Sequence, residues 1–309
     1  MAEVDRVIHA SLHSEVALVR QVSEYIIHGG GKRLRPALVL MSAGVMGYHG
    51  AGQHTLAAVV EFIHTATLLH DDVVDASDLR RGRETANALY GNAASVLVGD
   101  FLYSRAFQMM VALRNMHVME VLSEATNIIA EGEVLQLMNC NEPDVDESAY
   151  LRVIRYKTAK LFEASGRLGA IVSGASAEQE EALGRFGMHL GTAFQLIDDV
   201  LDYSGDTDVI GKNVGDDLAE GKPTMPLIFA MKHADVADAE LIREAIRQGD
   251  AGGFNDILAI VRKTGALDHA RAQAESEAAL ARQALDGLPD SQYQEALLEL
   301  TAFAVAREF

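Results

Sequence analysis

The chain has 309 residues, of which 49% are hydrophobic, and a formal net charge of −19 at pH 7. This strongly negative charge argues against a broad basic surface that could bind nucleic acid. Its single cysteine, Cys140, excludes an intrachain disulfide and a cysteine-rich zinc site. The N-terminus has neither the basic start nor the apolar core of a signal peptide, and no apolar run reaches the roughly 18 residues of a membrane span. We therefore expect a cytoplasmic protein.

Scarce proline and abundant Ala, Leu and Glu predict helices throughout. The first expected helix covers 3–28 and ends at three glycines, and Pro36 suits the first turn of the next helix. Further helices are expected over 53–75, 92–115, 117–139, 148–174, 178–204, 238–248, 252–264, 266–286 and 290–307, with an acidic loop over 205–226. No stretch resembles an interdomain linker. We predict one all-α domain over 1–309, a large helical bundle.

The helix expected over 53–75 ends in three acids, in the sequence HDDVVD. In a helix Asp71 and Asp75 share a face because they are four residues apart, and Asp72 points about 100° away. Like charges at this spacing, near the C-terminal end of a helix, are destabilising unless a cation lies between them. One such triplet can also be an ordinary solvated helix end.

The same pattern returns in GTAFQLIDDVLD, where the acids are Asp198, Asp199 and Asp202. The repeat favours a shared chemistry over a chance cluster. Mg²⁺ prefers oxygen ligands and often combines one or two carboxylates with substrate phosphates. The two triplets therefore predict metal ions that clamp a diphosphate.

The few basic residues are concentrated in the motifs GGGKRLRP, DLRRGR, RYKTAK and GKNVGDDLAEGKP. Arg binds phosphate as a planar fork and Lys as a point charge. GGGKRLRP lacks the spacing and the parallel-sheet context of a P-loop. Phosphate is therefore expected to be bound by side chains and metal, and surface patches remain the alternative for any single motif.

In these motifs, and in NAASVLVGDFLYSRAF, the sequence resembles the trans-type polyprenyl diphosphate synthases over nearly its whole length. The resemblance implies the isoprenoid synthase fold, a helical bundle around a central cavity, and a homodimer. It implies head-to-tail condensation of isopentenyl diphosphate onto an allylic diphosphate such as farnesyl diphosphate. The implied cofactor is Mg²⁺, with three ions when substrate is bound. The resemblance is to long-chain members that supply the ubiquinone side chain, with transient membrane contact at product release.

The resemblance also implies roles for single residues. Asp71, Asp75 and Asp198 would be the leading metal ligands, supported by Asp72, Asp199 and Asp202. Isopentenyl diphosphate would be bound by Lys32, Arg35, His64 and Arg81. The allylic diphosphate would be bound by Arg80, Lys157, Thr158, Gln195, Lys212 and Lys222, of which Lys157, Thr158 and Gln195 would also act in catalysis. A lone histidine on an apolar helix is more often a core residue, so His64 is assigned by the resemblance alone.

Product length is predicted from the helical turn before Asp71. Ala66 and Thr67 lie there, and bulky aromatic residues at these places block the growing chain in the resembled family. Two small residues leave a tunnel open and favour a long product. Eight, nine and ten prenyl units all stay open.

Three other functions fit the sequence less well, because both triplets are complete and the cationic motifs need an explanation. A class I terpene cyclase would share the helical fold and the first triplet, but its second metal motif would contain Asn, Ser and Glu. A metal-dependent phosphohydrolase, suggested by His70 next to Asp71, would need further histidine ligands. A catalytically silent partner subunit would lack acids from one triplet.

Overall fold

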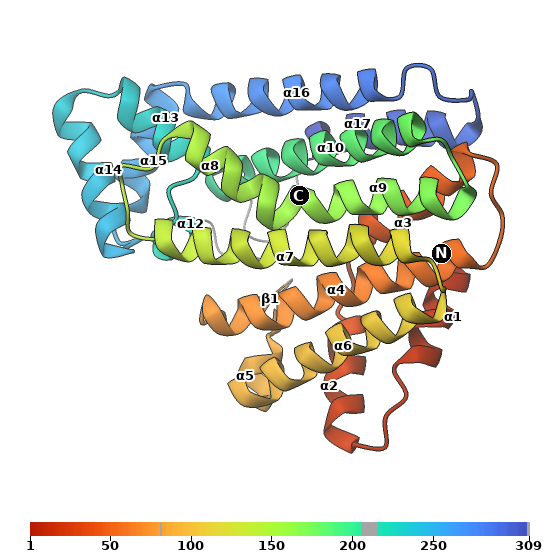
Figure 1. Cartoon of the computed structure of the whole chain (residues 1–309). Helices are drawn as coiled ribbons and strands as arrows, with labels where there is room; N and C mark the ends of the chain where they lie inside the picture. Colours follow the sequence, from red (N-terminus) through yellow and green to blue (C-terminus); the bar gives the residue numbers. More distant parts are fainter. Residues whose placement is uncertain (81, 205–214, 308–309) are drawn as a thin grey trace. The chain divides into compact units, whose positions relative to one another are not determined.

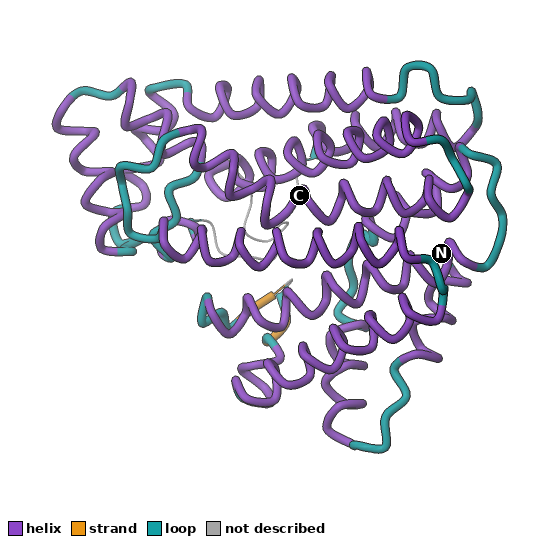
Figure 2. The backbone as a smooth tube through the Cα atoms, in the orientation of Figure 1, coloured by secondary structure: helices purple, strands orange, loops and turns teal. Residues whose placement is uncertain are grey.

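The computed structural model describes residues 1–80, 82–204 and 215–307. The chain divides into two compact units. The first unit comprises 1–126, 161–184 and 287–297, and the second comprises 127–160, 185–286 and 298–309. Almost all of the regular structure drawn in Figure 2 is helical, so the all-α prediction is confirmed. One domain with a central cavity stays a prediction.

The first unit is built around one long buried helix, α4 (Gly52–Val74). From Leu56 to Ile63 every α4 residue is buried, as expected for a helix that is apolar on all sides. Figure 1 shows α6 (Asn92–Ala112) lying beside α4 in this unit, and α3 (Leu34–Val45) also packs on it. The remaining elements are α1 (Ala2–Ser11), α2 (Ala17–Ile27), α5 (Ala86–Tyr90), most of α9 (Lys160–Ser173), and the hairpin of β1 (Leu79–Arg80) and β2 (Arg83–Glu84). Parts of three more helices belong to this unit: α7 (Met116–Asn139), α10 (Ala177–Ser204) and α17 (Gln292–Ala306).

The second unit holds the other acid triplet on α10 (Ala177–Ser204). Its core includes two apolar clusters, one around Leu196 and Val200 and one around Tyr203 and Ile242. Asp146 and Asp235 accept hydrogen bonds from backbone N–H groups three residues on, and so cap the helices that follow them. The other helices are α7 (Met116–Asn139), α8 (Glu147–Ile154), the π-helix η1 (Arg155–Ala159), α12 (Asp216–Ala219), α13 (Met225–His233), α14 (Val236–Gln248), α15 (Phe254–Lys263), α16 (Ala266–Ala284) and α17 (Gln292–Ala306).

Several details differ from the expected helices, among them the short helices α5 and α12, which the sequence interpretation did not include. The helix predicted over 3–28 is two helices, because Arg105 of α6 donates hydrogen bonds to the carbonyls of Ser11 and His13 that a continuous helix would use. The helix predicted over 148–174 contains η1. The sequence interpretation also missed α13, although Pro226 in its first turn is a helix-start signal.

Among the described helices, none combines the length and the apolarity that crossing a bilayer requires.

Candidate active site

The first acid triplet lies at the C-terminal end of α4. Asp71 and Asp72 occupy the last turn, and the backbone N–H of Asp75 donates to the carbonyl of Asp71 over 2.8 Å. The side chains of Asp71 and Asp75 are partly exposed, whereas Asp72 has no exposed surface. This contrast follows from the 100° step between consecutive helical residues. Asp71 and Asp75 are therefore the members of the triplet that a ligand can reach.

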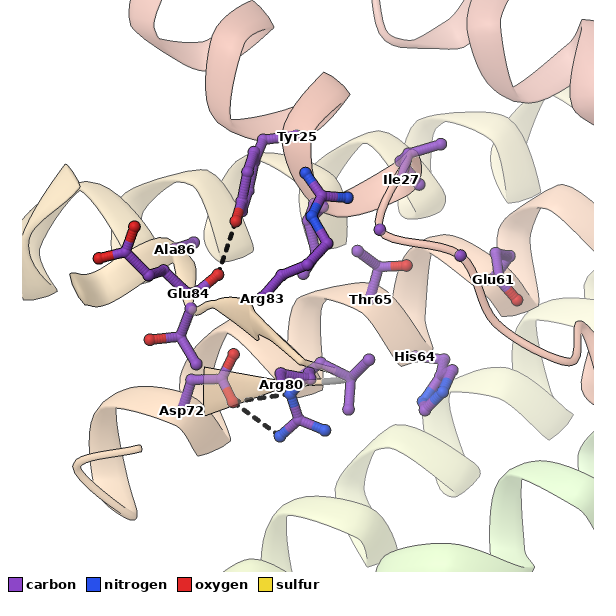
Figure 3. Close-up of a pocket in the computed structure, with 15 residues that line it drawn as sticks. Tyr25, Ile27, Glu61, His64, Thr65, Asp72, Arg80, Arg83, Glu84 and Ala86 are labelled. Carbon is purple, nitrogen blue, oxygen red and sulfur yellow. Dashed lines mark hydrogen bonds and ion pairs between the residues drawn. The ribbon is translucent and has the colours of Figure 1, made fainter. Parts of the chain in front are cut away.

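The buried Asp72 is neutralised by Arg80 from β1. The Nε and Nη2 atoms of Arg80 donate to the same oxygen, Oδ1, over 2.8 and 2.7 Å (Figure 3). Asp72 Oδ2 is buried and has no hydrogen-bond partner among the described residues. A buried oxygen without a donor is costly, so a donor or cation brought by a substrate would stabilise it. Arg80, predicted to bind diphosphate, is engaged by the triplet in this structure.

A pocket in the first unit opens beside this pair. His64, Asp72 and Arg80 line it, so three predicted site residues lie together (Figure 3). The pocket is also lined by Tyr25, whose hydroxyl donates to the carbonyl of Glu84 over 2.6 Å. The sequence interpretation did not include Tyr25, because a single aromatic residue on a helix looks like ordinary core.

Arg35 provides a second cation in this unit. Its Nη1 atom lies 3.2 Å from His64 Nε2, and its guanidinium carbon lies 4.4 Å from the ring centroid of Phe162. Because Arg35 can only donate, His64 accepts this bond as a neutral ring. Burial lowers the pKa of Arg35 to about 10, and the charge of Glu61 opposes that shift. Arg35 therefore stays cationic at neutral pH, and its buried Nε has no partner among the described residues.

Two further charged residues lie near this cation, in the sequence or in the structure. Lys32, predicted to bind isopentenyl diphosphate, is exposed. Glu61, which the sequence interpretation missed, is buried and pairs with Arg33 over 2.7 Å between Oε1 and Nη1. A carboxylate beside several cations keeps them from repelling one another before an anionic ligand binds.

The second triplet lies near the end of α10 in the second unit. The side chain of Asp198 is 43% exposed, and Arg307 Nη1 lies 3.6 Å from its Oδ1. Asp199 is buried, and its two oxygens accept hydrogen bonds from the hydroxyl of Tyr150 over 2.5 Å and from Gln195 Nε2 over 2.8 Å. Burial, together with the charge of Asp217, raises the pKa of Asp199 well above its usual range.

The two triplets thus share one arrangement. In each, the second aspartate is buried and held by neighbouring donors, while the first is partly exposed. The third acid of the second triplet, Asp202, accepts a long hydrogen bond of 3.4 Å from the backbone N–H of Asp217. Asp71, Asp75 and Asp198 are accessible carboxylates, and their oxygen atoms suit a hard divalent cation.

The structure brings the predicted Lys157, Thr158 and Gln195 together in the second unit. Lys157 Nζ lies 2.6 Å from Glu133 Oε2, and the hydroxyl of Thr158 donates to Gln195 Oε1 over 3.1 Å. Since Gln195 also donates to Asp199, the side chains of Thr158 and Gln195 form one connected network with the second triplet, and Lys157 is next to Thr158 in η1. Lys222 pairs instead with Glu220. Arg81 and Lys212 lie outside the described residues.

Within the described ranges, no group of three or more His, Cys, Asp or Glu side chains is arranged to hold a metal ion by itself.

The two residues predicted to set product length lie one turn before Asp71 on α4. Ala66 is fully buried, and the hydroxyl of Thr67 donates to the carbonyl of His64 over 2.8 Å. Two repeated acid sites, each with an arginine nearby, can bind a diphosphate together with divalent metal ions, which points to the class of enzymes that act on diphosphates.

Comparisons with known proteins agree with this class. A family model described as polyprenyl synthetase matches residues 16–261. The chain is 54% identical to the octaprenyl diphosphate synthase of Escherichia coli over 309 residues, covering 100% of this chain and 96% of that protein. It is 53% identical to the octaprenyl diphosphate synthase of Haemophilus influenzae over 310 residues, covering 100% and 94%.

A solved structure is similar over the same range. It is the polyprenyl synthase of Caulobacter crescentus in complex with calcium and isoprenyl diphosphate, with a TM-score of 0.97 and 45% identity over 100% of this chain and 95% of that one. The chain belongs to the polyprenyl synthetase family. The predicted resemblance, the isoprenoid synthase fold and the prenyltransferase class are therefore confirmed.

Proposed function

We propose that the protein is a long-chain trans-polyprenyl diphosphate synthase of the octaprenyl type. It joins isopentenyl diphosphate head-to-tail to an allylic diphosphate such as farnesyl diphosphate, and the product supplies the ubiquinone side chain. The observation that carries this proposal is the repeated triplet, with one accessible and one buried aspartate in each copy.

Isopentenyl diphosphate binds, in this proposal, to cations of the first unit. Lys32, Arg35 and Arg81 contact its phosphates, and His64 completes the site. The contact between Arg35 and His64 supports this assignment, because it sets a cation and a polar ring on one surface. A partly desolvated guanidinium interacts more strongly with an anion than one in bulk water does.

The allylic diphosphate is bound by Arg80, Lys157, Lys212 and Lys222. As the bond between the allylic carbon and the diphosphate breaks, negative charge grows on the leaving group, and nearby lysines and arginines stabilise it. The double bond of isopentenyl diphosphate then forms the new carbon–carbon bond, and the proton that is lost passes to the released diphosphate. Apolar surroundings protect the allylic cation from water.

Close to the reacting carbons, Thr158 and Gln195 orient their dipoles toward the allylic cation. Their hydrogen bond supports this role, because it fixes both side chains before substrate binds. Magnesium, as three ions when the substrates are bound, would be held by Asp71, Asp75 and Asp198, with Asp72, Asp199 and Asp202 in support, and would stabilise the charge of the departing diphosphate.

The small residues Ala66 and Thr67 leave room for a long product. Large exposed apolar side chains on the first unit, Leu97 at 66%, Val111 at 61% and Met116 at 71%, support a homodimer that covers them. The protein acts in the cytoplasm, with no nucleic-acid partner and with transient membrane contact at product release.

The test incubates the purified protein with Mg²⁺, farnesyl diphosphate and labelled isopentenyl diphosphate, with and without EDTA, and determines product masses. A metal-dependent ladder that ends near C40 supports the proposal. Loss of farnesyl diphosphate without incorporation of label would favour a cyclase or hydrolase, and no reaction would favour a silent subunit.

Variants locate the chemistry. Asp71→Ala and Asp198→Ala should abolish most condensation and leave the fold intact. The control is Asp78→Asn, because Asp78 is an exposed acid just after the first triplet. Turnover like that of the unaltered protein in either alanine variant would refute the metal assignment.

A further inference from the structure

A π-helix carries two of the proposed catalytic residues. In η1 (Arg155–Ala159) the backbone N–H of Lys160 donates to the carbonyl of Arg155, five residues back. π-helices are rare, occur mostly as single turns inside α-helices and are frequent at functional sites. The extra residue in this turn changes the direction of the side chains that follow Arg155, including Lys157 and Thr158. Something must hold this less favourable backbone in place.

One constraint is a close approach of α7. A Cβ atom at Gly132 would lie 2.6 Å from the backbone nitrogen of Lys157 and 2.9 Å from the carbonyl carbon of Tyr156. Only glycine lets α7 pack this closely against the backbone of η1. The contact fixes one side of the π-helix.

A second constraint comes from α16. Glu277 is 8% exposed, and both of its oxygens are engaged. Arg155 Nη2 donates to Oε1 over 3.0 Å, and His189 Nδ1 lies 2.6 Å from Oε2. Burial alone would raise the pKa of Glu277, but hydrogen bonds and charge from His189 and Arg155 lower it overall. One ionised carboxylate therefore ties η1 and α10 to α16.

Glu277 binds Arg155 and His189, and each of these precedes one partner of the Thr158–Gln195 hydrogen bond in the same stretch of helix. Arg155 is three residues before Thr158. His189 is six residues before Gln195 along α10, or about 9 Å at 1.5 Å per residue. A helix is stiff over this length, so the position of His189 fixes the position of Gln195. Glu277 therefore constrains both partners of that bond without contacting either.

We propose that Glu277 is a positioning residue, which through Arg155 and His189 sets Lys157 and Thr158 against Gln195 for the allylic substrate. This inference rests on the proposed function of those three residues. The side chain of Arg155 is 43% exposed, and an ion pair with so exposed a partner contributes little net stability, so a purely structural role explains the arrangement less well. Misplacement of a catalytic group by about 1 Å can lower a rate about 100-fold.

The test compares Glu277→Ala and Glu277→Gln with the unaltered protein. The glutamine keeps the size of the side chain and one acceptor oxygen, so it provides a folded variant if the alanine does not fold. We expect Glu277→Ala to lower kcat about 10-fold to 100-fold. The KM for isopentenyl diphosphate should stay within about two-fold, because its proposed ligands are in the first unit. The kcat of Glu277→Gln should lie between that of Glu277→Ala and that of the unaltered protein.

A matched control is Arg243→Met. It also removes an ion pair between separate segments of the second unit, that of Arg243 with Asp144, and leaves η1 untouched. Its kcat should not change. A double-mutant cycle with Lys157→Ala then separates positioning from general damage: Glu277→Ala should reduce kcat little further once Lys157 is absent.

Hydrogen exchange supplies a readout that does not depend on turnover. Amides of 155–160 should exchange faster in Glu277→Ala than in the unaltered protein or in Arg243→Met. An unchanged kcat in Glu277→Ala would overturn the inference, and so would unchanged hydrogen exchange at η1. It would also be overturned if the kcat losses of Glu277→Ala and Lys157→Ala multiplied in the double variant, because the two residues would then act independently. If Lys157→Ala has full activity while η1 exchange still rises in Glu277→Ala, the proposed catalytic role has failed and the structural tie has not.

Discussion

Arg80→Met tests how the first triplet is held together. Asp72 has no exposed surface, and Arg80 is its hydrogen-bond partner in the described structure. Removing one partner of a buried ion pair costs about 3–5 kcal/mol, because the other charge is left uncompensated. The side chain of Arg80 is 23% exposed, so solvent screens part of the interaction. We expect a loss of about 2–3 kcal/mol in the free energy of unfolding.

Urea unfolding measures this loss, and a second variant identifies its cause. Asp72→Asn combined with Arg80→Met replaces the buried charge by a neutral amide and should recover about 1–2 kcal/mol. Condensation should stay low in both proteins if Arg80 also binds the allylic diphosphate. A loss below about 0.5 kcal/mol in Arg80→Met would show that the pair behaves like a surface salt bridge, and the reasoning would be wrong.

Three further predictions concern product length, the π-helix and pH. Ala66→Phe or Thr67→Phe should shorten the product in mass spectra of the reaction, and an unchanged length would show that the growing chain does not pass there. Gly132→Ala should lower kcat, because its Cβ meets the backbone of Lys157, whereas Gly253→Ala, with open space around it, should not. The bond to Glu180 raises the pKa of His117 above 6.5, so its contribution to stability is full below that pH and is lost as the pH rises through the folded-state pKa. Because its ring is 46% exposed, the Tm difference between the protein and His117→Gln should be small below pH 6.5 and should decrease as the pH rises through the folded-state pKa.

The helices of the fold were predictable where apolar periodicity is long and local. The helices expected over 53–75 and 178–204 agree with α4 and α10 to within one residue at each end. The break between α1 and α2 was not predictable, because it depends on Arg105, which is about ninety residues further along the chain. η1 has no local signal either, since Gly132 and Glu277 constrain it from other helices.

The candidate site was predictable at the level of residue types. Spacing alone separates Asp72 from Asp71 and Asp75, and the structure places them on different sides of α4 as expected. The partners of these acids were not predictable. Tyr150 reads as one more core aromatic residue, and Glu277 reads as part of the solvated face of a helix. Each becomes functionally relevant only through a contact with a residue that is far away in the sequence, and no local sequence pattern predicts such a contact.

The two buried aspartates show why duplicated motifs need not be equivalent. Asp72 is neutralised by a cation, so its site carries no net charge from that pair. Asp199 is held by neutral donors, Tyr150 and Gln195, and burial raises its pKa. Behind the accessible Asp71 and Asp198, a bound cation would therefore lie near an arginine–carboxylate pair at the first triplet, and near a buried carboxyl group held by neutral hydrogen-bond donors at the second. The same three acids thus give two electrostatic environments, and the difference lies in the residues that surround them.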